Sequence, residues 1–86
     1  MTSTRTLLGK VAFVQGGSRG IGAAIVKHLA REGAKVAFTY ASSADQANAL
    51  VNEVIAASGQ ALAIRADSSD AQAVQQAIRT AVEHFA

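Results

Sequence analysis

Three glycines at a fixed spacing are the residues of this sequence best suited to bind a charged ligand. Gly16, Gly20 and Gly22 follow an apolar run, with Ser18 and Arg19 between them. A helix beginning here presents unpaired N–H groups and a positive dipole end, and both attract a phosphate. Gly16 allows a tight turn, Gly20 keeps the backbone clear of a side chain, and Gly22 permits close helix packing. The segment therefore predicts a phosphate-binding turn, with a plain glycine-rich turn as the alternative.

The residues after the second apolar run indicate which nucleotide this turn would bind. An NAD site usually has an acidic residue about 20 residues after the glycines, where it binds the ribose 2′-hydroxyl. Here the run ends at Tyr40 and continues with Ala41, Ser42 and Ser43, none of them acidic. Small hydroxyl residues and Arg19 suit the additional phosphate of NADP(H). Alternatively, Arg19 is a solvated loop residue, Tyr40 a half-buried strand end and Ser43 a helix cap.

A third candidate contact follows the third apolar run. Asp67 and Ser68 stand there, and a carboxylate at that place can accept a hydrogen bond from an adenine amino group. The alternative is an aspartate of a turn or helix start. Asp70 lies in the first turn of the next helix, where it complements the helix dipole. His28 and His84 have no partner cluster, so we expect no metal site.

Alternating strands and helices must position these residues. The expected strands span Lys10 to Gln15, Lys35 to Tyr40 and Ala61 to Ala66, and the expected helices span Gly20 to Glu32, Ala44 to Ser58 and Asp70 to Phe85. This βαβαβα pattern predicts an α/β fold: a Rossmann-like half fold whose three-stranded parallel sheet has the order 3-2-1. The first two helices should share one face of the sheet, and the third should cross to the other.

Helix ends and buried helix faces can also be predicted. Ser43 with Gln46, and Ser69 with Gln72, predict capping boxes, and Gly33 and Gly59 predict helix ends. Spacings of three and four predict one buried face for each helix. The faces are Ile21, Ala24, Ile25, His28 and Leu29; Ala47, Leu50, Val51, Val54 and Ile55; and Ala71, Val74, Ile78, Ala81, Val82 and Phe85.

Composition limits the class of protein. Half of the 86 residues are hydrophobic and 16% are charged, which is typical of a globular domain. There is no cysteine, no apolar run of membrane-spanning length and no secretory signal, so we expect a cytoplasmic protein without membrane contact. The net charge is +2 and the basic residues are scattered, which argues against nucleic acid as a partner.

These features together resemble the N-terminal third of the short-chain dehydrogenase/reductase family, most of all its 3-oxoacyl-acyl-carrier-protein reductase type. The resemblance rests on GGSRGIG, on YASS and on Asp67. It implies that residues 1–86 are one dinucleotide-binding segment of a domain of about 250 residues. The implied NADP contacts are Gly16, Ser18, Arg19, Gly20, Ile21 and Gly22 for the phosphates, Tyr40, Ala41, Ser42 and Ser43 for the 2′-phosphate, and Asp67 and Ser68 for adenine. Gln15 and Ser68 depart from the family's usual threonine and apolar residue.

The resemblance further implies hydride transfer between NADPH and a carbonyl or alcohol, by a catalytic Ser and a Tyr-x-x-x-Lys pair. The only tyrosine is Tyr40, and residue 44 is an alanine. We therefore expect no catalytic residue here and no activity from these residues alone. A second interpretation is a structural or self-associating module without significant nucleotide affinity. An exposed first strand, Val11 to Val14, would favour self-association into a dimer or larger species, with a loosely packed monomer as the alternative.

Overall fold

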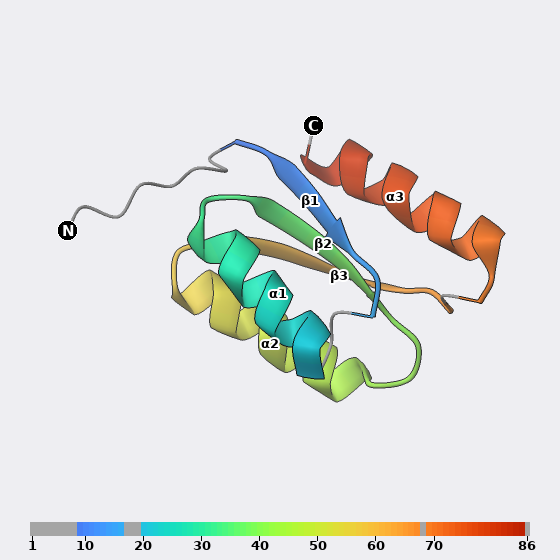
Figure 1. Ribbon diagram of the computed structural model, residues 1–86, viewed down its shortest axis with the longest axis horizontal. Coiled ribbons are helices and arrows are strands. Elements are labelled where there is room, and N and C mark those ends of the chain that lie inside the picture. The colour runs from blue at the N-terminus through green and yellow to red at the C-terminus, as the bar shows by residue number, and fades with distance from the viewer. Residues whose placement is uncertain (1–8, 17–19, 68, 86) are drawn as a thin grey trace.

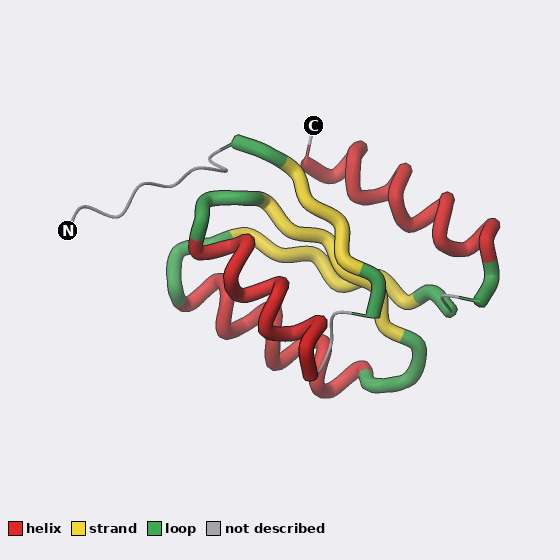
Figure 2. The backbone as a smooth tube through the Cα atoms, viewed as in Figure 1, coloured by secondary structure: helices red, strands yellow, loops and turns green. Residues whose placement is uncertain are grey.

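Three parallel strands form the centre of the protein in a computed structural model, which describes residues 9–16, 20–67 and 69–85 (Figures 1 and 2). In chain order the elements are β1 Val11–Val14, α1 Gly20–Arg31, β2 Lys35–Tyr40, α2 Ala44–Ala56, β3 Gln60–Arg65 and α3 Ala71–Phe85. The sheet order is β1-β2-β3, the predicted 3-2-1 order read from the opposite edge, and both pairs are parallel. The predicted Rossmann-like half fold is confirmed.

Helices cover both faces of the sheet. Figure 1 shows α1 and α2 side by side on one face and α3 on the other, as predicted. Side chains alternate along β2, so Val36 and Phe38 join the core under α1 and α2, while Ala37 and Thr39 face α3. All four are buried, which explains why β2 is a nearly continuous apolar run.

The buried face of α1 differs from the predicted one. Val26 is fully buried, and Ala23, Leu29 and Ala30 pack around it, whereas Ile21 is 81% exposed. Apart from Leu29, the predicted face was wrong, because α1 is apolar on most sides and spacing alone cannot choose between adjacent faces. Of the other predicted positions, the exposed ones are Ala24, Ile25 and His28 on α1, Ile55 on α2, and Ala71, Ile78 and Val82 on α3.

No helix in the described ranges has the length and hydropathy needed to cross a membrane.

Both predicted capping boxes are wrong. The Ser43 side chain makes no capping hydrogen bond, because its ψ of 59° lies outside the extended region typical of a side-chain cap. At α3 the cap is Asp70, whose Oδ1 accepts hydrogen bonds from the N–H groups of Gln72 at 3.1 Å and Ala73 at 3.2 Å. The Ser69 hydroxyl is used elsewhere, in a bond to Asp67.

Helices α1 and α2 end in the same type of turn. After α1, Gly33 has a φ of 100°, and the Ala34 N–H donates to the Leu29 carbonyl. After α2 the left-handed residue is Ser58, with a φ of 69°, and the Gly59 N–H donates to the Val54 carbonyl. Gly33 therefore ends α1 as predicted, whereas Ser58 rather than Gly59 takes the left-handed position after α2.

Gly59 is required for a different reason, which is space. A Cβ at Gly59 would lie 2.8 Å from Val54 Cγ1 and 3.2 Å from the Val54 carbonyl oxygen. The chain therefore passes too close to the end of α2 for a side chain at this position.

Two substitutions at this turn should change stability in opposite directions. Ser58→Gly removes a left-handed side-chain residue and should raise the free energy of unfolding by about 0.5–1 kcal/mol. Gly59→Ala should lower it by about 1–3 kcal/mol through overpacking. Urea unfolding measures both, and Ser58→Ala, which keeps the Cβ, is the control with little change expected. A destabilising Ser58→Gly would contradict this account of the turn.

Candidate functional site

The carboxyl ends of the three strands meet at one edge of the sheet. In the parallel register Val14 pairs with Phe38, and Tyr40 pairs with Arg65, so all three chains leave the sheet on the same side. Figure 1 shows α1 beginning at this edge. The turn after β1, the loop after β2 and the segment after β3 are therefore brought together, as the sequence predicted.

Two hydrogen bonds between neighbouring strand ends hold this edge together. The Gly16 N–H donates to Thr39 Oγ1 at 3.0 Å, which joins the turn after β1 to the end of β2. The Ala66 N–H donates to the Tyr40 carbonyl at 2.9 Å, which joins β2 to the segment that carries Asp67. The three predicted contact regions are consequently linked in a fixed lateral order.

The glycine turn has the geometry that a close ligand needs. Gly16 has a φ of 66° and Gly20 a φ of 64°, a region that side-chain-bearing residues rarely adopt. A Cβ on either glycine would meet no heavy atom of the described residues within 4 Å. The first turn of α1 contains no acidic residue, so none repels an anion from its N-terminus. Gly22 is half-buried, and Ser18 and Arg19 lie outside the described residues.

The loop after β2 presents two exposed residues and one hydroxyl that does not cap the following helix. Ala41 and Ser42 are exposed. Ser43 occupies the cap position of α2 through its carbonyl, which accepts from the Ala47 N–H at 2.9 Å, while its hydroxyl makes no capping bond. Tyr40 is half-buried and packs against the core, as expected for a strand end.

Asp67 is exposed, and its carboxylate is fixed by its own neighbour. Its Oδ1 accepts hydrogen bonds from the Ser69 N–H at 2.9 Å and from the Ser69 hydroxyl at 2.8 Å. These hydrogen bonds hold the pKa of Asp67 below the ordinary value of 3.8, and the bond from the Ser69 backbone has a larger effect than the bond from its hydroxyl. Asp67 therefore offers an ionised, oriented acceptor at neutral pH. Ser68 lies outside the described residues.

Thr39 is the residue of this edge that sequence reasoning missed. It is buried, with 1% of its surface exposed, and its hydroxyl accepts the bond from Gly16. The available signal was one hydroxyl inside the apolar run KVAFTY, because a buried hydroxyl needs a partner.

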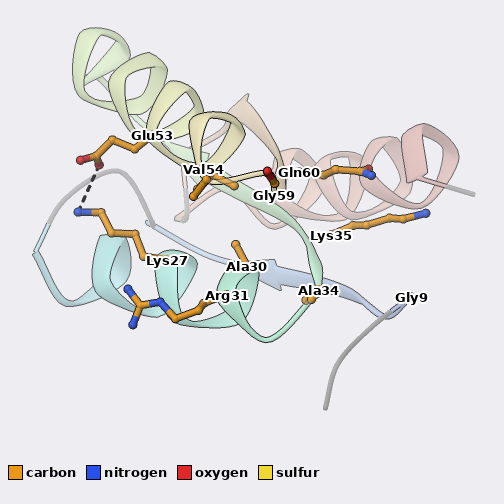
Figure 3. Close-up of a pocket in the computed structure, with 13 residues that line it drawn as sticks. Gly9, Lys27, Ala30, Arg31, Ala34, Lys35, Glu53, Val54, Gly59 and Gln60 are labelled. Carbon is orange, nitrogen blue, oxygen red and sulfur yellow. Dashed lines mark ion pairs between the residues drawn. The ribbon is translucent and has the colours of Figure 1, made fainter. Parts of the chain in front are cut away.

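A hollow of about 520 Å³ lies at the opposite end of the sheet (Figure 3). The ends of α1 and α2 line it, and the Lys27 Nζ and Glu53 Oε2 atoms are 3.2 Å apart in an ion pair there. Figure 3 shows the Arg31 and Lys35 side chains pointing in different directions, so the cations do not converge. Helix C-termini carry partial negative charge, which disfavours a pyrophosphate in this hollow.

Comparison with known proteins assigns the family. A family model described as short chain dehydrogenase matches residues 10–86, nearly the whole chain. The chain belongs to the short-chain dehydrogenase family. Its sheet, its glycine turn and the carboxyl edge described above are thus those of a family member, and the resemblance inferred from the sequence is confirmed.

Three similar proteins show how much of a family member this chain represents. A 3-oxoacyl-[acyl-carrier-protein] reductase of Synechocystis sp. is 44% identical over 79 residues, which cover 92% of this chain and 32% of the reductase. A short-chain dehydrogenase/reductase of Serratia marcescens superposes with a TM-score of 0.90 at 71% identity, covering 92% of this chain and 32% of that one. A short chain dehydrogenase of Burkholderia cenocepacia, solved in complex with NADP, superposes with a TM-score of 0.88 at 53% identity and the same two coverages. The chain spans about a third of the length of these relatives.

The bonds from Ser69 to Asp67 predict a measurable titration. A carboxyl-detected NMR titration should place the Asp67 midpoint below 3.8, and Ser69→Ala should raise it while leaving it below 3.8, because the backbone bond remains. Because the folded-state pKa is lowered, the ionised group stabilises the fold above the unfolded pKa, and this contribution is lost as the pH falls through the folded pKa. Ser58→Ala, at the far end of α2, is the control. A wild-type midpoint at or above 3.8 would contradict the bonding described here.

Proposed function

We propose that this chain is the NADP(H)-binding segment of a cytoplasmic oxidoreductase that transfers hydride between NADPH and a carbonyl or alcohol. The observation that carries the proposal is the left-handed conformation of Gly16, just after β1, and of Gly20, at the start of α1, whose first turn contains no acidic residue. Support for the cofactor comes from the Burkholderia cenocepacia relative, whose structure holds NADP.

Each part of the carboxyl edge has a role in this proposal. The N–H groups of the first turn of α1, including those of Gly20, Ile21 and Gly22, bind the pyrophosphate together with Ser18. Arg19 pairs with the 2′-phosphate. The loop that begins at Tyr40 assists it, through the exposed residues Ala41 and Ser42 and the hydroxyl of Ser43. Asp67 accepts a hydrogen bond from the adenine amino group through Oδ2, because both hydrogen bonds from Ser69 go to Oδ1. Ser68 borders the adenine ring.

The residues of this chain bind and orient the cofactor. Bound NADPH supplies the hydride. The group that protonates the carbonyl lies outside these 86 residues, because no tyrosine here is followed four residues later by a lysine. The proposed role is therefore cofactor capture rather than proton transfer.

Titration of NADPH and NADH into the protein at low salt tests the proposed function. NADPH should bind saturably, about tenfold or more tightly than NADH, because a charge-assisted bond to the 2′-phosphate is worth about 1.5–3 kcal/mol. Arg19→Ala should abolish most of this preference and leave NADH binding nearly unchanged. Arg31→Ala, at the far end of α1, is the matched control. An absence of saturable binding would contradict the proposed function. Equal affinities of the wild type for NADPH and NADH would contradict the 2′-phosphate assignment.

A second role of this chain is self-association, and it is compatible with cofactor binding. Among the described residues β1 pairs with β2 alone, so the other edge of β1 presents open backbone groups. Val11 on this strand is 44% exposed. A second copy of the chain could therefore add its own strand to the sheet.

Sedimentation velocity over a range of concentrations tests this association. The wild-type chain should form a dimer or larger species, and Val11→Lys should shift it toward monomer, because a lysine on an edge strand opposes pairing. Ile55→Lys is the control: it replaces another exposed apolar residue, which lies on α2 away from the edge strand, and it should not shift the chain toward monomer. A wild-type chain that stays monomeric at high concentration rules this role out.

A further inference from the structure

We infer that Thr39 is a positioning residue of the cofactor site: its hydroxyl holds Gly16 in place where the chain leaves β1 on its way to the pyrophosphate-binding N-terminus of α1. The inference rests on the proposed function and adds a residue that contacts no ligand. The Gly16 N–H donates to Thr39 Oγ1 at 3.0 Å, across 23 positions of sequence.

The bond lies at the point where the regular ladder between β1 and β2 stops. The last paired residues of β1 and β2 are Val14 and Phe38, and the chain beyond β1 turns toward α1. Gly16 is exposed and in a left-handed conformation, so little packing holds it there. The Thr39 hydroxyl supplies an anchor from inside the sheet.

The anchor also determines which amide groups are left for the ligand. The N–H of Gly16 is directed at the sheet and is used by Thr39. The N–H groups at the start of α1 have no intrahelical acceptor and remain available to the phosphates. Holding Gly16 thus fixes the position from which the chain enters that binding turn.

Burial distinguishes positioning from direct contact. Thr39 is 1% exposed and lies one residue before Tyr40, at which the proposed 2′-phosphate loop begins. A side chain buried in this way cannot touch the 2′-phosphate. Its loss should therefore weaken NADPH and NADH binding equally, because both carry the pyrophosphate.

Two variants with opposite effects on the hydroxyl test the inference in the 86-residue chain. Thr39→Val keeps the shape and removes the hydroxyl, and it should weaken both dinucleotides by about threefold to tenfold without changing their ratio. Thr39→Ser keeps the hydroxyl and should bind within about twofold of the wild type. Affinities are measured at a temperature at which unfolding curves show every variant folded.

Alternative outcomes of these titrations overturn the inference. A loss confined to NADPH would make Thr39 a direct 2′-phosphate contact. Unchanged affinities in both variants, with only stability reduced, would make it a residue of the core. A Thr39→Ser variant as weak as Thr39→Val would assign the effect to packing rather than to the hydroxyl.

Amide hydrogen exchange at Gly16 is a second measurement, independent of any dinucleotide. In the wild type and in Thr39→Ser this amide should be protected although the residue is exposed, and Thr39→Val should exchange about tenfold faster or more. Unprotected exchange in the wild type overturns the inference even if Thr39→Val does not fold. If the wild type binds neither dinucleotide, the proposed function fails. A protected Gly16 amide would then still support Thr39 as the residue that anchors Gly16, whereas an unprotected amide would contradict that role as well.

Discussion

The parallel pairing of β1, β2 and β3 is the constraint on which the candidate site depends. Parallel strands need crossover helices, so every strand leaves the sheet at the same edge and every helix begins there. The N-terminus of α1, the loop after β2 and Asp67 are therefore neighbours although they are far apart in the sequence. An antiparallel arrangement of the same segments would place them at opposite ends of the sheet.

The two ends of the sheet differ electrostatically for the same reason. The carboxyl edge receives helix N-termini, and the opposite end, where the hollow of Figure 3 lies, receives the C-termini of α1 and α2. An anionic ligand is stabilised at the first and destabilised at the second. The hollow of Figure 3 is therefore the poorer candidate for a dinucleotide, and the carboxyl edge with Gly16 and Gly20 is the better one.

Local sequence signals predicted much of the fold. β2 was predicted at its observed bounds, Lys35–Tyr40, because a strand buried on both faces is a continuous apolar run with clear limits. The α1 face was mispredicted because Ala23, Val26 and Ala30, rather than the larger Ile21, contact the core. Close helix–sheet packing selects small residues, and a pattern of hydrophobicity does not measure size.

Single hydrogen bonds were the features least accessible from the sequence. Asp70 rather than Ser69 caps α3, and the choice depends on backbone angles that neighbouring polar residues could adopt equally well. The bond from Gly16 to Thr39 depends on the register between two strands, which the sequence of either strand does not specify. The ligand contacts of all the predicted site residues remain predictions, and Ser18, Arg19 and Ser68 also lie outside the described residues.

An NMR titration with NADPH, followed through the glycine amides, tests the location of the site most directly. Glycines stand at both ends of the sheet: Gly16, Gly20 and Gly22 at the carboxyl edge, and Gly33 and Gly59 beside the hollow. Saturable shifts are expected for the first three, with Gly33 and Gly59 unmoved. Shifts of Gly33 and Gly59, with those of Gly16, Gly20 and Gly22 unchanged, would place the dinucleotide at the opposite end of the sheet and contradict a site at the carboxyl edge.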